Sequence, residues 1–580
     1  MRFAQLSLMM SSLLLTACGG TETAPTASNT VKPDSPAVSQ TVKFELNQLG
    51  FRPYSFKVAV VSSSDATEFS LVSEQNNQVV YTGNLSEAAN WDVANQQVQV
   101  ADFSDFDQQG NFKLVVGNNQ SDEFVISDDA YQAVHNAALK AFYFNRASTA
   151  LSTEFAGDYA RAAGHADDKV KIHASAASAN RPAGCEISAP KGWYDAGDYN
   201  KYIVNSGIST YTLLSAYRQY AAFYQQQLTD IPESANSVPD IIDEANWNLD
   251  WMRSMQDPVD GGVYHKLTTL NFAGMVMPKD ATAQRYVVQK TVTAALDYAA
   301  TLALASRIYT DLGEPNSAKA ADYIQAAEKA WQWAVEHPQA YYQQPEDVST
   351  GAYGDNNAED EFFWAAAELY LTTQKDIYWQ YVSEHWLNAS TPGWGNVGTL
   401  GLLSLQSEGK SLLSAADYQN VQQRLTDYAN QVVSDAQSSA YQVAMNRTDF
   451  VWGSNANALN KAMVLMQLFA SNQNSDYKKA AQGLLDYVLG RNPTGYSYVT
   501  GFGHKTPMHI HHRPSEADGI AEPVPGWLAG GAQNGQQDDC NYPSNLPALS
   551  YVDDVCSYST NEITINWNAP LVFVLAALNQ

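Results

Sequence analysis

Residues 43–128 carry hydrophobic and polar side chains in short alternating runs. The clearest runs lie at residues 57–61, 97–100, 113–116 and 124–126, and clusters of Gly, Asn and Asp separate them. Such alternation is typical of strands with one buried face. Several short strands within about 85 residues favour two packed sheets, so we expect a β-sandwich of the immunoglobulin type.

From residue 129 to residue 580 the hydrophobic period becomes helical. Ile242, Ala245, Leu249 and Met252 fall on one helical face. The same signature recurs at residues 292–309, 320–335, 362–371, 456–469 and 477–489. An all-helical domain of this size must bury many apolar faces, and a toroid of helical hairpins would do so. The pattern does not distinguish that toroid from a solenoid.

The N-terminus predicts export. A basic start and a short apolar run precede Leu-Thr-Ala-Cys, which ends at Cys18. The run is shorter than the ~20 apolar residues that span a bilayer, and it is typical of a secretory signal. The tetrapeptide resembles the bacterial lipobox, in which the Cys is lipidated. We therefore expect a lipoprotein signal peptide at residues 1–18 and a flexible tether at residues 19–42, with the outer membrane as the expected anchor site.

Charge narrows the range of partners. The chain has 61 acidic and 33 basic residues and a net charge of −28. That charge repels phosphate backbones and anionic headgroups, so nucleic acid is not an expected partner. Membrane contact is expected only through the lipid anchor. A neutral or cationic ligand held on aromatic faces fits the composition better.

Three further cysteines follow Cys18, namely Cys185, Cys540 and Cys556. An oxidising compartment favours one disulfide and one free thiol. Cys540 and Cys556 are near in sequence and bracket a loop rich in Asn, Pro and Asp, so we pair them. Zinc-ribbon spacing is absent from the sequence.

The first candidate site is Trp-Tyr-Asp-Ala-Gly-Asp at residues 193–198. Asp195 and Asp198 lie three residues apart between small and aromatic side chains. Two carboxylates this close would shift each other's pKa and could orient and deprotonate a water. A calcium loop or simple turn chemistry is the alternative, although the EF-hand pattern is missing.

Two further segments could contribute chemistry. Glu562 stands just before an apolar helix and could be a catalytic acid or only an acid favoured at a helix start. His509, His511, His512 and Arg513 could bind a metal, or could hold sugar hydroxyls and carboxylates.

Together these segments resemble glycoside hydrolase family 9, the inverting cellulase family. Residues 497–505 with 510–513 fit its His-x-Arg signature, and residues 551–569 fit its second signature. Residues 193–198 are similar to its Asp-Ala-Gly-Asp block. Residues 47–51, with the strands after them, are similar to the immunoglobulin-like module that precedes many members. The resemblance implies an (α/α)6 barrel after the sandwich.

Roles follow from the resemblance. Asp198 is the implied general base, Asp195 helps to position the attacking water, and Glu562 is the implied general acid. An inverting hydrolase needs one ionised and one protonated carboxyl about 6.5–9.5 Å apart. Implied or candidate substrate contacts are His511, Arg513, Asp553, Tyr264, His265, Tyr558, Trp567, Trp394 and Trp452. The resemblance also implies that the first three of these orient the acid.

Metal sites are where the chain departs from the family. Many members carry a structural zinc bound by Cys and His, but Ala147 stands where a Cys is usual, and His173 has only Cys185 nearby. We therefore do not expect the zinc, and no metal ligand is assigned. Structural calcium, frequent in the family, stays open. Catalysis is expected to need no cofactor.

The sequence thus predicts an endoglucanase that cleaves β-1,4-glucosidic bonds in cellulose-type glucans or cello-oligosaccharides. Two alternatives stay open. One is an exo-acting glucosidase or glucosaminidase on short oligosaccharides, and the other is a non-catalytic carbohydrate-binding lipoprotein.

Overall fold

A computed structural model describes residues 42–313 and 316–579. The predicted signal peptide with Cys18, and all but the last residue of the tether at residues 19–42, lie outside the described residues.

The first module is a sandwich of two sheets, as expected. One sheet has the strand order β1-β2-β6-β5 and the other the order β4-β3-β7-β8, with β9 also paired to β7. Phe51 sits between the sheets and meets Phe103 and Phe124 edge to face, with ring centroids 5.3 and 5.8 Å away. The strands are β1 Phe44–Glu45, β2 Val58–Ser62, β3 Glu68–Ser73, β4 Val79–Asn84, β5 Ala89–Trp91, β6 Gln96–Asp102, β7 Gly110–Val116, β8 Asn119–Gln120 and β9 Phe124–Ile126.

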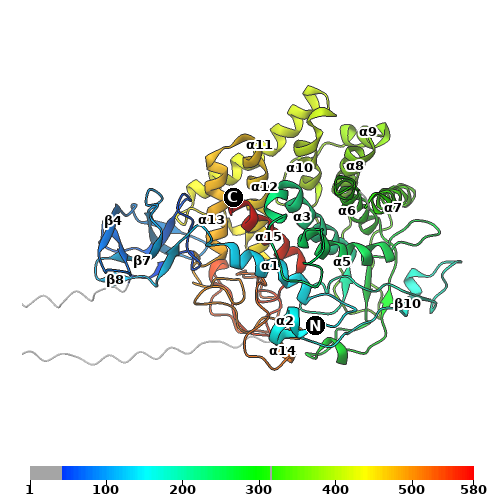
Figure 1. Cartoon of the computed structure of the whole chain (residues 1–580), viewed down its shortest axis with the longest axis horizontal. Helices are drawn as coiled ribbons and strands as arrows, with labels where there is room; N and C mark the ends of the chain where they lie inside the picture. The colour runs from blue at the N-terminus through cyan, green and yellow to red at the C-terminus, as the bar shows by residue number, and fades with distance from the viewer. Residues whose placement is uncertain (1–41, 314–315, 580) are drawn as a thin grey trace, which may run out of the picture. The chain divides into compact units, whose positions relative to one another are not determined.

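Figure 1 shows the helices of the second module beside the sandwich, and their contacts form a closed double ring. Within the inner ring each helix contacts the next, and the last one, α15, contacts the first, α3. The ring therefore closes into an (α/α)6 barrel, and the solenoid alternative is wrong. The inner helices are α3 Ile203–Gln219, α6 Val292–Asp311, α8 Glu359–Thr373, α10 Gly398–Glu408, α12 Ser454–Asn472 and α15 Ile565–Leu578.

Each inner helix has an outer partner. Helix α5 packs on α3, α7 on α6, α9 on α8, α11 on α10, α13 on α12 and α1 on α15. These outer helices are α1 Gln132–Phe144, α5 Asp240–Ser254, α7 Ser317–Glu336, α9 Asp376–Glu384, α11 Ala415–Ser438 and α13 Ser475–Val488.

Hydrophobicity separates the two rings. Every residue of the inner helix α15 is buried, whereas the long outer helix α11 buries a single stripe. A helix that is apolar all round requires neighbours on every side, and an amphipathic helix requires neighbours on only one. The sequence pattern thus assigns each helix to its ring.

The inner helices all begin at the same end of the barrel, since the segments that precede them line one cavity there. A small sheet with the order β11-β10-β14-β13-β12 lies among these connecting segments. Its strands are β10 Val170–Ile172, β11 Glu186–Ile187, β12 Lys201–Tyr202, β13 Lys266–Thr268 and β14 Tyr286–Val287. Short helices also occur in the connections, namely α2 Thr153–Ala156, α4 Ala221–Tyr224 and α14 Arg513–Ala517.

The sandwich lies against α13 (Figure 1) and is tied to the barrel by buried polar contacts. The Asn47 amide donates to Asp486 of α13 at 2.9 Å. The Trp91 ring lies 4.2 Å from that of Tyr441.

The predicted disulfide joins Cys540 to Cys556, and Cys185 is free and exposed. Among the described residues, none of the helices combines the length and the apolar character that crossing a membrane requires.

Candidate active site

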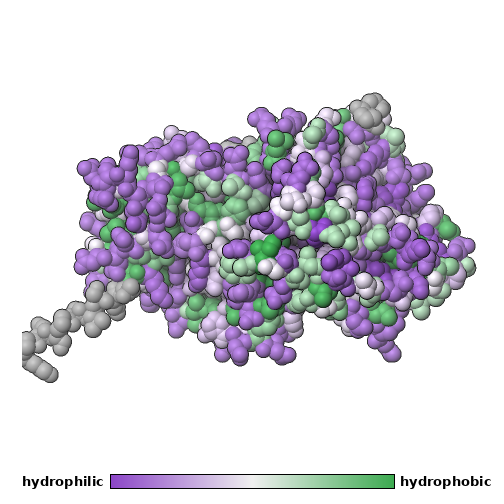
Figure 2. All heavy atoms as spheres, turned by 60° about the horizontal axis from the view of Figure 1, so that its bottom comes forward, coloured by the Kyte–Doolittle hydropathy of each residue, from purple (hydrophilic) through white to green (hydrophobic). Residues whose placement is uncertain are grey.

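A cavity of about 920 Å³ opens at the end of the barrel where the inner helices begin. Figure 2 turns this end toward the viewer, and apolar side chains interrupt the hydrophilic surface near the middle of the face. The lining comes from segments that are far apart in the sequence, including residues 195–202, 349–353, 511–513 and 562–567. The barrel therefore brings the three predicted segments into one volume.

Gly197 is the point where these segments meet. Its N–H donates to Glu562 Oε1 at 3.3 Å, and its carbonyl accepts from the backbone N–H of Arg513 at 3.1 Å. A Cβ on Gly197 would lie 2.0 Å from the carbonyl oxygen of His511. Only glycine fits this close approach, which explains the glycine between the two aspartates.

Asp195 is held from both sides. Asn205 Nδ2 donates to Oδ1 at 2.5 Å, and the Tyr353 hydroxyl donates to Oδ2 at 2.7 Å. The Asp195 carbonyl oxygen accepts from the Thr564 hydroxyl at 3.0 Å, which ties this loop to the segment after Glu562. Both carboxyl oxygens of Asp195 are thus engaged.

Asp198 keeps one oxygen free. Its Oδ2 accepts from Asn200 Nδ2 and, at 3.3 Å, from the Tyr202 hydroxyl. Its Oδ1 is buried and has no hydrogen-bond partner among the described residues. An unpaired buried carboxylate oxygen is costly unless something binds it. It can therefore accept a proton or a hydrogen bond from a molecule in the cavity.

The three carboxyl groups have unequal proton affinities. Burial, together with Asp198 and Asp195, raises the pKa of Glu562 well above its ordinary value. Burial and Asp198 raise the pKa of Asp195 to about 8. Burial also raises the pKa of Asp198, but the Arg513 guanidinium opposes that rise. Glu562 is therefore protonated at neutral pH, as a general acid must be.

His511 and Arg513 line the cavity as expected. His511 Nδ1 contacts the Val555 carbonyl at 2.6 Å, which fixes the ring. Arg513 Nη1 donates to the Gly197 carbonyl at 2.7 Å, and Nε donates to the Ala273 carbonyl at 2.9 Å. Arg513 thus holds two loops together beside the carboxyl groups.

Asp553 does not line the cavity, so of its two predicted roles only the orientation of the acid fits its position. Its carboxylate accepts from the backbone N–H groups of Met508 and His509 and from the Asn561 amide. Asn561 directly precedes Glu562, so Asp553 orders the segment that carries the acid.

Tyr264 and His265 are also corrections, because both are fully buried outside the cavity. His265 Nε2 contacts the Ala352 carbonyl at 2.9 Å, and its ring stacks on Tyr342 at 4.1 Å. The Tyr264 hydroxyl donates to Asp257 at 3.4 Å. These side chains pack the loops behind the cavity instead of facing a sugar.

Aromatic side chains form much of the cavity wall. The predicted Trp394, Trp452, Tyr558 and Trp567 all line it. Trp452 is 43% exposed, and its ring lies 5.5 Å from that of Tyr558. Such exposed faces suit the apolar faces of sugar rings.

Several lining residues were missed from the sequence, namely Tyr202, Phe272, Tyr353, Gln537 and Asn566. Phe272, Tyr353 and Gln537 come from long connections outside the three motifs, whereas Tyr202 follows the first motif and Asn566 stands within the second signature. The length of those connections was the one available signal, because long loops in compact domains are usually functional.

The residues around Ala147 do not fit the family's zinc. Ala147 packs with Tyr194 and Tyr199, and the imidazole beside them, His165, contacts the Tyr194 hydroxyl through Nδ1 at 2.8 Å. Elsewhere in the described residues, the ligand atoms of Cys540, Asp554 and Cys556 converge, but the two sulfurs form the disulfide. We assign no step of the chemistry to a metal.

A protonated and an ionisable carboxyl, gathered beside an aromatic wall in an (α/α)6 barrel, define a glycoside hydrolase. The chain belongs to glycosyl hydrolase family 9, whose model matches residues 131–575. A cellulase N-terminal Ig-like domain matches residues 39–121.

Relatives agree along nearly the whole chain. The chain is 43% identical over 549 residues to the xyloglucan-specific endo-β-1,4-glucanase BoGH9A of Bacteroides ovatus, covering 92% of this chain and 93% of that one. It is 31% identical to endoglucanase D of Acetivibrio thermocellus, covering 92% and 83% of the two chains.

Solved structures agree as well. One described as Bacteroides ovatus GH9 has a TM-score of 0.87 and 41% identity, covering 92% of this chain and 98% of that one. The GH family 9 endoglucanase J30 has a TM-score of 0.86 and 30% identity, covering 91% and 99% of the two chains. The predicted fold, family and endo-β-1,4-glucanase type are confirmed.

Proposed function

We propose that the protein hydrolyses internal β-1,4-glucosidic bonds of a glucan main chain with inversion. The observation that carries the proposal is the free Oδ1 of Asp198 in the same cavity as the protonated Glu562. Asp198 takes a proton from water as the water oxygen bonds to the anomeric carbon. The glycosidic bond breaks, and Glu562 gives its proton to the departing oxygen. These side chains supply the acid and the base, so we infer no cofactor for the step.

The two aspartates have different roles in this proposal. Both oxygens of Asp195 already accept hydrogen bonds, which leaves it to hold the loop and orient the water. Asp198 has the free oxygen, and Arg513 favours its ionised form. Asp198 is therefore the base.

Support for a β-1,4-glucan comes from the relatives. The two curated relatives described above are named as endoglucanases, one of them specific for xyloglucan. The aromatic wall suits a sugar chain, and the net charge of −28 suits a neutral ligand.

Proton NMR of the products from cello-oligosaccharides of defined length tests the proposal. We expect α-anomeric products at early times, released from internal bonds. Early β-anomeric products would refute inversion, and stepwise loss of end sugars would favour the exo alternative.

Two amide variants test the assigned acid and base. Glu562→Gln and Asp198→Asn should lower turnover by about 10²–10⁴-fold while oligosaccharide binding is retained. Wild-type protein that binds cello-oligosaccharides without cleaving them would instead support the binding-lipoprotein alternative.

We also propose that the chain is an exported lipoprotein anchored in the outer membrane through Cys18. The support is the Leu-Thr-Ala-Cys sequence after a short apolar run. Mass spectrometry of the N-terminal peptide should find a lipid on Cys18, and Cys18→Ser should release the protein from the membrane fraction. Unmodified Cys18 in a membrane-free protein would refute the anchor.

A further inference from the structure

A second pocket adjoins the cavity that holds the carboxyl groups. It has a volume of about 510 Å³, within the ~300–1,000 Å³ typical of small-ligand sites, and we call it the side pocket. Phe272 lines both the side pocket and the catalytic cavity. A ligand in the side pocket would therefore lie next to a sugar chain in the cavity.

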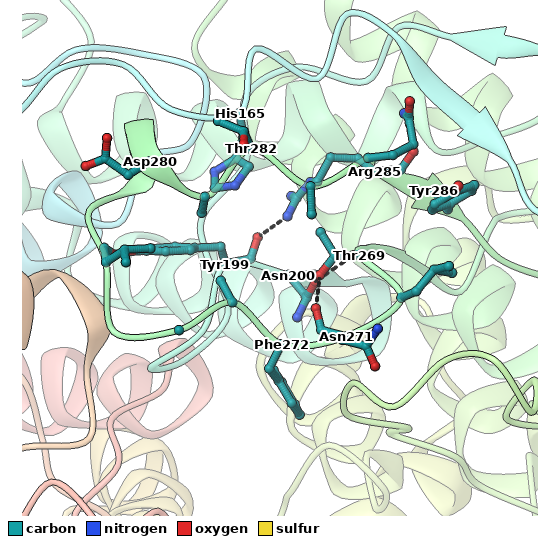
Figure 3. A pocket seen from close by; sticks show the side chains of 17 residues that line it. His165, Tyr199, Asn200, Thr269, Asn271, Phe272, Asp280, Thr282, Arg285 and Tyr286 are labelled. Atoms are coloured by element: carbon teal, nitrogen blue, oxygen red, sulfur yellow. Dashed lines mark hydrogen bonds between the residues drawn. The ribbon is translucent and has the colours of Figure 1, made fainter.

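The walls of the side pocket are fixed by hydrogen bonds. One wall is residues 269–274, which follow β13, and the facing wall is residues 280–286, which lead into β14. The Tyr199 hydroxyl donates to the Val276 carbonyl at 2.6 Å, and Arg285 Nη1 donates to the Tyr199 carbonyl at 2.7 Å. Figure 3 shows Tyr199, Asn200, Thr269 and Arg285 around the pocket, with Phe272 at its lower edge. The pocket is thus a built feature of the loops.

The same residues connect the side pocket to the catalytic machinery. Asn200 lines the pocket and donates to Asp198. The Arg513 guanidinium lies 5.6 Å from the Phe272 ring centroid, and Arg513 Nε holds the Ala273 carbonyl. The wall between the two cavities is therefore braced by residues beside the base.

The charges of the side pocket favour a neutral ligand. Arg285 is buried and shares the Asp167 carboxylate with Lys201, at 3.1 and 2.8 Å, so its charge is partly balanced. The Asp280 carboxylate points away from the ring of labelled side chains in Figure 3. What remains is aromatic surface together with uncharged hydroxyl and amide groups, including Thr282 and Asn271. This mixture suits the hydroxyls and apolar face of a sugar.

We propose that the side pocket binds a single-sugar branch of the glucan main chain whose backbone lies in the catalytic cavity. The inference rests on the proposed function, because it places that backbone beside Phe272. A branch on a glucose hydroxyl, such as the xylose of xyloglucan, would extend past the Phe272 side chain, which lines both cavities, into the side pocket. The side pocket then selects branched over unbranched β-1,4-glucans.

Binding to the Glu562→Gln protein tests the pocket separately from catalysis. Calorimetry would compare a cellotetraose with the same chain carrying one xylose branch. We expect the branched chain to bind about tenfold more tightly. Failure of the wild-type protein to cleave either chain would refute the proposed function, whereas the affinity ratio reports on the pocket alone.

Two variants fill the side pocket from opposite walls. Ala283→Trp acts from an exposed position, and Gly274→Phe adds a side chain where a Cβ meets no atom within 4 Å. Each should remove most of the tenfold preference. Ala416→Trp, an equal change at an exposed site at the start of α11, should keep it. An unchanged ratio in either folded pocket variant, or no preference in the Glu562→Gln protein itself, overturns the proposal.

Discussion

Replacing Gly197 by Ala tests whether the close approach of the loops sets the catalytic geometry. The added Cβ would lie 2.0 Å from the His511 carbonyl oxygen, whereas real Cβ contacts stay beyond 3.0 Å. The loops must therefore separate by about 1 Å, which is the order of misplacement that costs about 100-fold in rate. Any such shift acts directly on Glu562 and Arg513, because Gly197 hydrogen bonds to both.

We therefore expect Gly197→Ala to lower kcat by about 100-fold, which corresponds to about 2.7 kcal/mol in the activation barrier. Strain in the folded state should cost a further 1–3 kcal/mol or so of stability. Gly393→Ala is the matched control, because its Cβ meets no atom within 4 Å.

The assay combines initial rates on a cello-oligosaccharide with thermal unfolding of both variants. A Gly197→Ala protein that is folded and keeps kcat within about threefold of wild type would refute the reasoning. A loss of rate in Gly393→Ala equal to that in Gly197→Ala would refute it too, because that loss could not arise from the contact with His511.

Three further predictions concern charge, covalent bracing and stacking. Arg513→Gln should move both limbs of the pH–rate profile to higher pH, because Arg513 lowers the pKa of Asp198 and Glu562, whereas Arg513→Lys should shift them less. Cys540→Ser should lower the free energy of unfolding by about 3 kcal/mol in chemical denaturation, since the disulfide closes a loop of sequence separation 16, and serine at the free Cys185 should not. Trp452→Ala should raise KM for a cello-oligosaccharide about fivefold through loss of about 1 kcal/mol of apolar contact.

Much of the fold is encoded in local periodicity. The helical period at residues 456–469 and 477–489 predicted α12 and α13 almost to their ends. Closure of the ring was not predictable in the same way. It depends on the packing of α15 against α3, and these two helices are far apart in the sequence of the domain. Periodicity reports which face of a helix is buried but not which partner buries it.

The site residues likewise divide into those that the sequence predicted and those that it did not. Asp195, Asp198 and Glu562 stood in motifs whose spacing has a chemical meaning, and the cavity gathers all three. Tyr353 had no such signal, because its hydroxyl reaches Asp195 only through the tertiary fold. His265 was misread because its motif is structural, and the side chain is buried behind the cavity.

The position of Arg513 affects how protons and charge are distributed between chemically similar carboxyl groups. Among the described residues lining the cavity, it is the only arginine, and no lysine joins it. Burial raises the pKa of Asp198 and of Glu562, which opposes a negative charge on either carboxyl group. Arg513 lowers both pKa values and so offsets part of this effect. For Asp198 it is the largest influence that favours ionisation, whereas for Glu562 both aspartates outweigh it. Arg513 therefore favours a charge on Asp198 more than on Glu562, which is the division that a base and an acid require.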